Sequence, residues 1–144
     1  MDNYKTGLHL WDRWTEMWNG RPELALELVA PKFTLHLTSG RGTDPTTIDT
    51  PARVVEWVRG HRAKFTNLTF STQVGPFVDE KAGVVAGPWS ADTTADGKPS
   101  FACGMDTIAF RDGLITEYWT LSTPVDRVAT WDQTAFQYLK RPRI

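Results

Sequence analysis

The hydrophobic residues near the N-terminus recur at the spacing of an α-helix. At about 100° per residue, one stripe of such a helix gathers Leu10, Trp11, Trp14, Met17 and Trp18. The positions between them are mostly polar. The pattern predicts an amphipathic helix with a face of bulky aromatic rings. Such a face packs a hydrophobic core or lines a cavity for a flat apolar ligand, and the helix alone favours core packing.

Further helices and a strand are predicted between residues 22 and 65. Pro22 stands at a favourable helix start, and this second helix is expected to continue until Pro31 stops it. Residues 33–37 alternate as a short strand, and residues 38–49 are rich in Gly, Thr and Pro, which predicts a loop. A third helix follows, capped by Thr50, and its apolar stripe contains Val54, Val58, His61 and Phe65, with Trp57 beside it.

The second half of the chain alternates with the period of β-strands. Strands are predicted over residues 68–74, 84–92, 101–110 and 114–121, and the Asp-Gly pairs at 96–97 and 112–113 predict hairpins. Pro88 cannot donate to a strand ladder, so it marks an edge or a bulge. Helices followed by a meander predict an α+β fold, in which a curved antiparallel sheet wraps over the N-terminal helices. Residues 126–139 have roughly helical spacing and are expected to close the open end of the sheet or to fold over its outer face.

The composition is that of one ordinary globular domain spanning residues 1–144. The chain is 40% hydrophobic and 23% charged, with a formal net charge of −1, so no nucleic-acid or membrane partner is expected. The single cysteine, Cys103, excludes an internal disulfide and a cysteine-based zinc cage, and the dispersed histidines predict no metal site. Without an apolar leader or a run of transmembrane length, a cytoplasmic protein is expected.

A carboxylic acid in the middle of a predicted strand is the strongest candidate for chemistry. Asp is depleted in strands, yet Asp106 lies far from either hairpin turn. If it faces an aromatic pocket, the loss of solvation raises its pKa and suits it to act as a general acid or a neutral hydrogen-bond donor. The alternative is a solvated Asp on the outer face of the sheet.

The side chains around Asp106 depend on the length of the second hairpin loop. A three-residue loop places Asp106 opposite Tyr118 and puts Thr116 and Thr120 on the same face, whereas a two-residue loop inverts the strand and brings Trp119 to that face. We choose the three-residue loop, because it puts hydroxyl groups beside the carboxyl.

The first hairpin leaves a similar choice for the preceding strand. A three-residue loop at residues 96–98 puts Ser90 and Asp92 on the Asp106 face, and a two-residue loop puts Trp89 there instead. An Asp close to a turn is also typical of an ordinary solvated residue.

The segment from Gly104 to Trp119 resembles the last two strands of the nuclear transport factor 2-like superfamily, above all of its SnoaL-like polyketide cyclases and ketosteroid isomerase. Trp18-Asn19-Gly20, at the end of the first helix, and Ala30-Pro31-Lys32-Phe33, before the first strand, extend the likeness over most of residues 8–122. The resemblance implies a cone-shaped fold around an apolar pocket. It implies little about the reaction, because this fold hosts isomerases, cyclases, dehydratases, hydrolases and non-catalytic modules.

The resemblance also implies roles for residues of the pocket. Asp106 matches the pocket carboxyl of ketosteroid isomerase and the acid proposed for SnoaL-like cyclases. Leu37 stands where ketosteroid isomerase has its catalytic base, which argues against steroid isomerisation. The neighbouring His36 is either a substitute base or a hydrogen-bonded structural residue. Trp14 stands in place of an oxyanion-binding Tyr and donates one N–H group.

Together these features predict a small-molecule enzyme that needs no cofactor, a cyclase, isomerase or lyase that works by acid–base proton transfer. Asp106 is its expected acid, with His36 or Asp92 as partner. The expected ligand is hydrophobic and cyclic or polyketide-like, and its site is expected to include Trp11, Trp14, Trp18, His61, Trp89, Tyr118 and Thr120. The alternative is a non-catalytic ligand-binding or dimerisation module of the same fold.

The outer face of the sheet is expected to pair with a second copy of the chain. The chosen register turns Met105, Thr107, Glu117 and Trp119 away from the cavity. An exposed Trp beside a Met is typical of a partner surface, and two-fold pairing would bury it. The sequence therefore predicts a homodimer.

Overall fold

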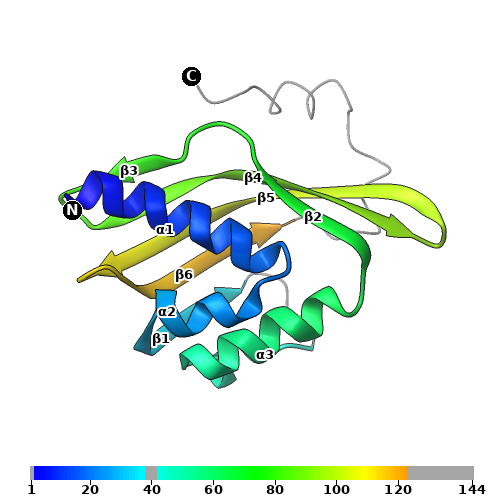
Figure 1. Cartoon of the computed structure of the whole chain (residues 1–144), viewed down its shortest axis with the longest axis horizontal. Helices are drawn as coiled ribbons and strands as arrows, with labels where there is room; N and C mark the ends of the chain where they lie inside the picture. The colour runs from blue at the N-terminus through cyan, green and yellow to red at the C-terminus, as the bar shows by residue number, and fades with distance from the viewer. Residues whose placement is uncertain (1, 38–41, 123–144) are drawn as a thin grey trace.

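Three α-helices and six strands form the described part of the molecule (Figure 1). The computed structural model describes residues 2–37 and 42–122. The predicted segment 126–139 lies outside them. The helices are α1 (Asn3–Trp18), α2 (Ala25–Leu28) and α3 (Pro51–Arg62), with short 3-10 turns η1 (Pro22–Leu24) and η2 (Pro45–Thr47). The strands are β1 (Val29–Leu37), β2 (Thr66–Thr72), β3 (Phe77–Asp79), β4 (Val84–Ala95), β5 (Lys98–Arg111) and β6 (Leu114–Ser122).

The strands form one curled, unclosed sheet with the helices on one of its sides (Figure 1). The strand order is β1-β6-β5-β4-β2, and β3 pairs with β4 beside β2. This arrangement confirms the predicted α+β cone. Four of the strand pairings are antiparallel, and β1 pairs with β6 in parallel. The short strand β3 was not predicted, since its three residues are too few to show alternation.

The first helix carries the predicted aromatic stripe into the interior. Asp2 caps it, because the carboxylate accepts a hydrogen bond from the backbone N–H of Lys5 at 2.8 Å. The stripe is buried as expected, with exposed fractions of 7% or less at Leu10, Trp11, Trp14, Met17 and Trp18. Beyond the helix end, the side-chain amide of Asn19 donates to the carbonyl of Phe70 at 2.9 Å and accepts from its N–H at 2.6 Å. These two hydrogen bonds attach the end of α1 to β2.

The second helix is shorter than predicted. Helix α2 ends at Leu28, and β1 begins at Val29 and continues through Pro31. Pro31 is tolerated because β1 is an edge strand and its pairing with β6 is interrupted between Val29 and Thr34. The third helix agrees with its predicted start: the hydroxyl of Thr50 accepts a hydrogen bond from the N–H of Arg53 at 3.3 Å.

Both hairpins are closed by two-residue Asp-Gly loops. The residues before and after each loop pair directly, and Asp96 and Asp112 take positive φ values of 50° and 51°, as hairpin turns of this length require. The three-residue loop predicted for the second hairpin was therefore wrong, and in the first hairpin the two-residue alternative is the one found. On β6, however, Thr116 bulges out of the ladder between Ile115 and Glu117. The bulge shifts the register once more, so Asp106 pairs with Thr120.

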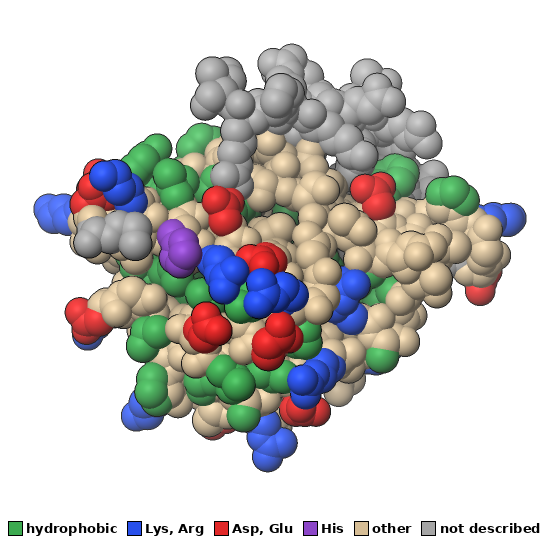
Figure 2. Space-filling model, in the orientation of Figure 1, with side chains coloured by type: hydrophobic (Ala, Val, Ile, Leu, Met, Phe, Trp, Pro, Cys, Tyr) green, Lys and Arg blue, Asp and Glu red, His purple; other side chains and the backbone are tan. Residues whose placement is uncertain are grey.

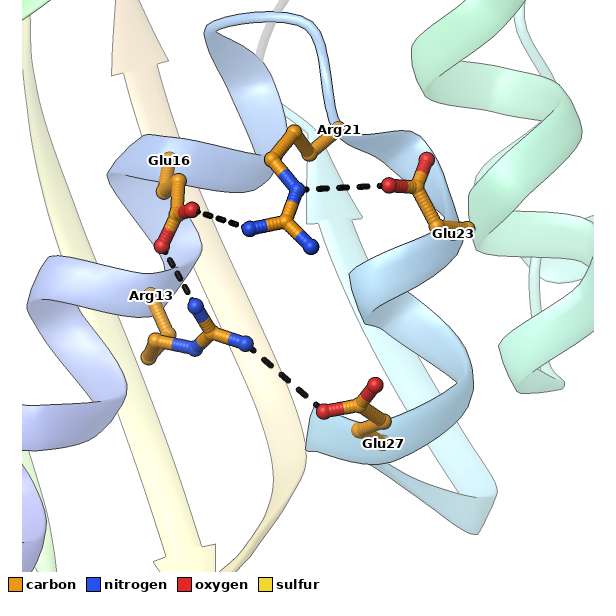
Figure 3. A network of polar contacts seen from close by, with 5 residues as sticks. All are labelled: Arg13, Glu16, Arg21, Glu23 and Glu27. Carbon is orange, nitrogen blue, oxygen red and sulfur yellow. Dashed lines mark hydrogen bonds and ion pairs between the residues drawn. The ribbon is translucent and has the colours of Figure 1, made fainter.

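Ion pairs link the exposed sides of α1 and α2 (Figure 3). Arg13 contacts Glu16 at 2.6 Å and Glu27 at 3.7 Å, and Arg21 contacts Glu16 at 2.6 Å and Glu23 at 3.4 Å. The hydrogen bond from Arg21 lowers the pKa of Glu16. Charged side chains of both signs are interspersed over this side of the molecule (Figure 2). No helix in the described ranges has the length and apolarity to cross a membrane.

Candidate functional site

A cavity of about 330 Å³ lies between the helices and the inner face of the sheet. Its volume falls within the range of small-molecule sites. All seven residues predicted to form the ligand site line it: Trp11, Trp14, Trp18, His61, Trp89, Tyr118 and Thr120. Asp106 lines it as well. The sequence thus located the walls of the cavity, although it did not show what the cavity binds.

Asp106 is held on both carboxyl oxygens by neutral donors. The phenol of Tyr118 donates to Oδ2 at 2.5 Å, and the indole N–H of Trp89 donates to Oδ1 at 2.7 Å. The Asp106 side chain is buried, and the neighbouring Thr120 adds a further hydrogen bond. None of the described residues contributes a cation to this arrangement. The carboxyl is therefore oriented without being neutralised by an ion pair.

Burial raises the pKa of Asp106 from its ordinary value of 3.8 to about 6. The hydrogen bonds from Tyr118, Thr120 and Trp89 oppose this rise, because they stabilise the charged form. The pKa of the Tyr118 phenol is raised too, by burial and by the neighbouring Asp106 charge, so the phenol stays protonated. A carboxyl with a pKa near 6 both takes up and releases protons close to neutral pH, as an acid–base catalyst must.

A glycine makes room for the indole that reaches Asp106. Gly104 pairs with Trp89 across β4 and β5, and a Cβ at this position would lie 2.6 Å from Cζ2 of the Trp89 ring. No larger residue fits without moving the ring. The sequence analysis did not use this glycine. The available signal was a glycine within a predicted strand, two residues before Asp106, because such a glycine often marks a place where another group comes close to the backbone.

Aromatic rings form a continuous wall of the cavity. Ring centroids lie 4.8 Å apart between Trp14 and Tyr118, 6.3 Å between Tyr118 and Trp57, and 4.9 Å between Trp57 and Trp18. These are the distances at which aromatic pairs pack favourably. Because the rings pack against one another and still border the cavity, the aromatic stripe of α1 is both core and wall.

His36 does not reach the cavity, so its predicted partnership with Asp106 was wrong. It lies on the outer face of the sheet, where its ring stacks on Trp119 with centroids 4.7 Å apart. Its Nε2 is 3.0 Å from a carboxylate oxygen of Glu117. Strand alternation explains the placement, since the adjacent Leu37 points to the cavity. The alternative of a hydrogen-bonded structural histidine agrees with this geometry.

Asp92 also lies away from the cavity, as an exposed residue on the outer face of β4. Its predicted role as a partner of Asp106 was therefore wrong. The reason is the loop length: the two-residue turn puts Trp89 on the Asp106 face and Asp92 on the other, which was the alternative weighed for this hairpin.

Several lining residues were not predicted. Trp57, Lys64 and Phe65 come from α3 and the turn after it, and Phe70 comes from β2. The helical stripe of α3 and the alternation around Phe70 carried the signal for the aromatic members. Lys64 had no such signal, because it is polar and does not belong to the apolar stripe. Within the described ranges, no three His, Cys, Asp or Glu side chains come together in a group that could hold a metal ion.

Comparison with known families gives one clear match. The profile of the SnoaL-like domain matches residues 11–118. This range contains Asp106, Trp89 and Tyr118 together with the aromatic part of α1. No curated protein is significantly similar to the chain in sequence.

Several solved structures share this fold, and the ones described here are named as candidate enzymes. A candidate polyketide cyclase from Acidithiobacillus ferrooxidans has a TM-score of 0.73 and 22% identity, covering 87% of this chain and 95% of its own. A candidate isomerase from Bacillus subtilis has a TM-score of 0.72 and 15% identity, covering 90% and 96%. IdmH, a candidate polyketide cyclase from Streptomyces antibioticus, has a TM-score of 0.65 and 23% identity, covering 81% and 91%. At these identities the likeness establishes the fold.

Proposed function

Because the chain belongs to the SnoaL-like domain family, we propose that it is an enzyme that transfers a proton on a small hydrophobic molecule, with Asp106 as the acid–base group. The observation that carries the proposal is a buried carboxyl with a pKa of about 6 on the wall of an aromatic cavity. Relatives of this shape that are named as candidate cyclases and isomerases support the same class of reaction.

The proposed chemistry begins with the ionised carboxylate. It removes a proton from a carbon next to a carbonyl group of the ligand, and the electron pair of the broken C–H bond passes to the carbonyl oxygen as an enolate. The protonated Asp106 then returns the proton to the enolate at the same or another carbon. Tyr118 and Trp89 hold the carboxyl in place throughout. Such proton transfer contributes about 10²- to 10⁴-fold to a rate.

Hydrogen–deuterium exchange tests this proposal without knowledge of the natural substrate. 2-Tetralone is a flat bicyclic ketone with exchangeable protons, and NMR in D₂O follows their loss. We expect the wild type to accelerate the exchange over buffer and Asp106→Asn to abolish the acceleration. Asp92→Asn, which removes a carboxylate from the outer face, is the matched control and should exchange as the wild type does. Retained exchange in Asp106→Asn would contradict the assignment.

A non-catalytic ligand-binding module is the second candidate. The observation in its favour is that Tyr118 and Trp89 already engage both oxygens of Asp106, as they would in a structural hydrogen-bond cluster. Under this alternative, 2-tetralone binds, shown by quenching of tryptophan fluorescence, and is recovered without catalysed exchange.

A further inference from the structure

The charges of the cavity are separated between its two ends. Among the described residues that line it, Asp106 is the only carboxylic acid and Lys64 the only residue with a permanent positive charge. Asp106 is 7% exposed, whereas Lys64 is exposed. The acid therefore lies at the closed end of the cavity and the amine at its rim.

A path of aromatic rings connects the two ends. It runs from Tyr118, which binds Asp106, through Trp57 and Trp18 to His61, with 5.4 Å between the centroids of the last two rings. Phe65 continues it at 5.1 Å from His61, directly beside Lys64. A flat apolar ligand in contact with this wall extends from the carboxyl towards the amine.

The two charged side chains that act on His61 near the rim, Lys64 and Arg62, are both cations. Lys64 makes no ion pair with a carboxylate in the ranges that the structure describes. Arg62, two residues away, donates to the carbonyls of Trp18 at 2.6 Å and Leu68 at 2.9 Å, which are neutral acceptors. The pKa of His61 is lowered by burial and, further, by the charges of Lys64 and Arg62, as expected where positive charge is not compensated.

We propose that the cavity binds a flat carboxylic acid, with its ring system between the aromatic walls and its carboxylate at the rim beside Lys64. The proposal rests on the proposed function, since it concerns the ligand of the same cavity. The hydrophobic ring system leaves water for the aromatic walls. The carboxylate stays hydrated at the rim and lies beside the positive charge of Lys64, so no charged group of the ligand is buried without a partner. A ligand with a cationic end is disfavoured at this rim.

A matched pair of probes tests the charge preference. 6-Hydroxy-2-naphthoate and 6-hydroxy-2-naphthamide share one ring system and differ in the charge of one end. Calorimetric titration of both should show that Lys64→Gln weakens binding of the naphthoate by about two- to fivefold, the range for an exposed ion pair, while binding of the naphthamide does not change. Lys64→Arg, which keeps the charge, should retain the preference.

Lys81→Gln is the control, because this lysine lies in the turn before β4 and does not line the cavity. It should bind both probes as the wild type does. If Lys64→Gln leaves the affinity for the naphthoate unchanged, or weakens both probes equally, the carboxylate position at the rim is refuted. If the wild type binds neither probe, the cavity does not take flat bicyclic acids and the proposal fails. Neither result depends on the exchange of 2-tetralone, so failure here and failure of the acid–base function are distinguishable.

Discussion

Asp106 combines deep burial with hydrogen bonds that favour its ionised form. These two effects oppose each other, and burial is the larger. The balance leaves the carboxyl with a pKa of about 6, and no charged group in the described part of the chain contributes to that value. Both the proton uptake of this residue and its cost to stability follow from that balance.

Stability should fall as Asp106 ionises. The folded protein binds the proton more tightly than the unfolded chain, so the contribution of Asp106 to the free energy of unfolding decreases as the pH rises from about 4 to about 6. A rise from 3.8 to about 6 corresponds to about 3 kcal/mol. Urea unfolding of the wild type and Asp106→Asn at several pH values isolates this effect, because other groups titrate equally in both. A difference between the two proteins that is independent of pH would contradict the raised pKa.

The hydrogen bond from the indole of Trp89 should limit how far burial raises the pKa of Asp106. Trp89→Phe keeps a ring in place but removes the N–H donor, which destabilises the carboxylate and raises its pKa above 6 by about one unit. NMR titration of the Asp106 carboxyl carbon measures the change. Trp11→Phe is the matched control, since the Trp11 N–H donates to the hydroxyl of Thr72 instead. Equal pKa values in the two variants would show that Trp89 does not tune the acid.

At the scale of elements, the strands β4, β5 and β6 act together to build the site. Trp89, Asp106 and Tyr118 come from these three strands and meet only because their registers agree. Gly104 allows the close approach of β4's indole to β5. The geometry of the acid is therefore sensitive to changes in the sheet that leave the acid itself intact.

Gly104→Ala should damage both stability and the site. The added Cβ would lie 2.6 Å from the Trp89 ring and 2.1 Å from the carbonyl oxygen of Leu121, so backbone and ring must both move. We expect the free energy of unfolding to fall by about 1–3 kcal/mol. Gly60→Ala is the control: no atom lies within 4 Å of its added Cβ, and alanine favours the helix, so this variant should be unchanged or more stable. Urea unfolding compares them, and equal effects would refute the crowding at Gly104.

The elements were largely predictable from the sequence, and the registers were not. The stripe of α1 and the cap of α3 are local patterns, and both were predicted correctly. The face of Tyr118 was also correct, but for a reason the sequence did not reveal: the loop is one residue shorter than expected, and the bulge at Thr116 restores the face. The predicted positions of His36 and Asp92 were wrong, because the alternation of a strand decides which face each residue takes. For Asp92 that alternation is fixed by the length of the hairpin turn, and for His36 by the pairing of the edge strand β1 with β6.

At the scale of the whole molecule, the sheet has one face inside and one outside. The outer face carries the large hydrophobic residues Met105, Trp119 and Leu121, exposed by 38% to 57%. Beside them, Nε2 of His36 lies 3.0 Å from a carboxylate oxygen of Glu117. A patch that holds both an acid and a base is complementary to itself, which suits a two-fold interface.

A homodimer through this outer face remains our prediction. Sedimentation should show a particle of twice 16.2 kDa at micromolar concentration. Trp119→Glu should split it into monomers by placing a charge in the interface. Leu26→Glu is the control, because Leu26 is 61% exposed on α2, on the helical side of the molecule. A wild type that sediments as a monomer would refute the dimer.

The bulge at Thr116 has a consequence for how sequences of this kind can vary in length. The two-residue Asp112-Gly113 loop and the unpaired Thr116 together decide whether Tyr118 faces Asp106 or the solvent. A deletion of Thr116 alone would remove the bulge and leave the later pairs as they are, so Tyr118 would still lie opposite Ile108 and face the cavity. The loss of two residues between Ile115 and Tyr118 would instead pair Tyr118 with Ala109 and turn its ring outward. Where the buried acid is kept, this segment should therefore vary in length by the single bulged residue and not by two.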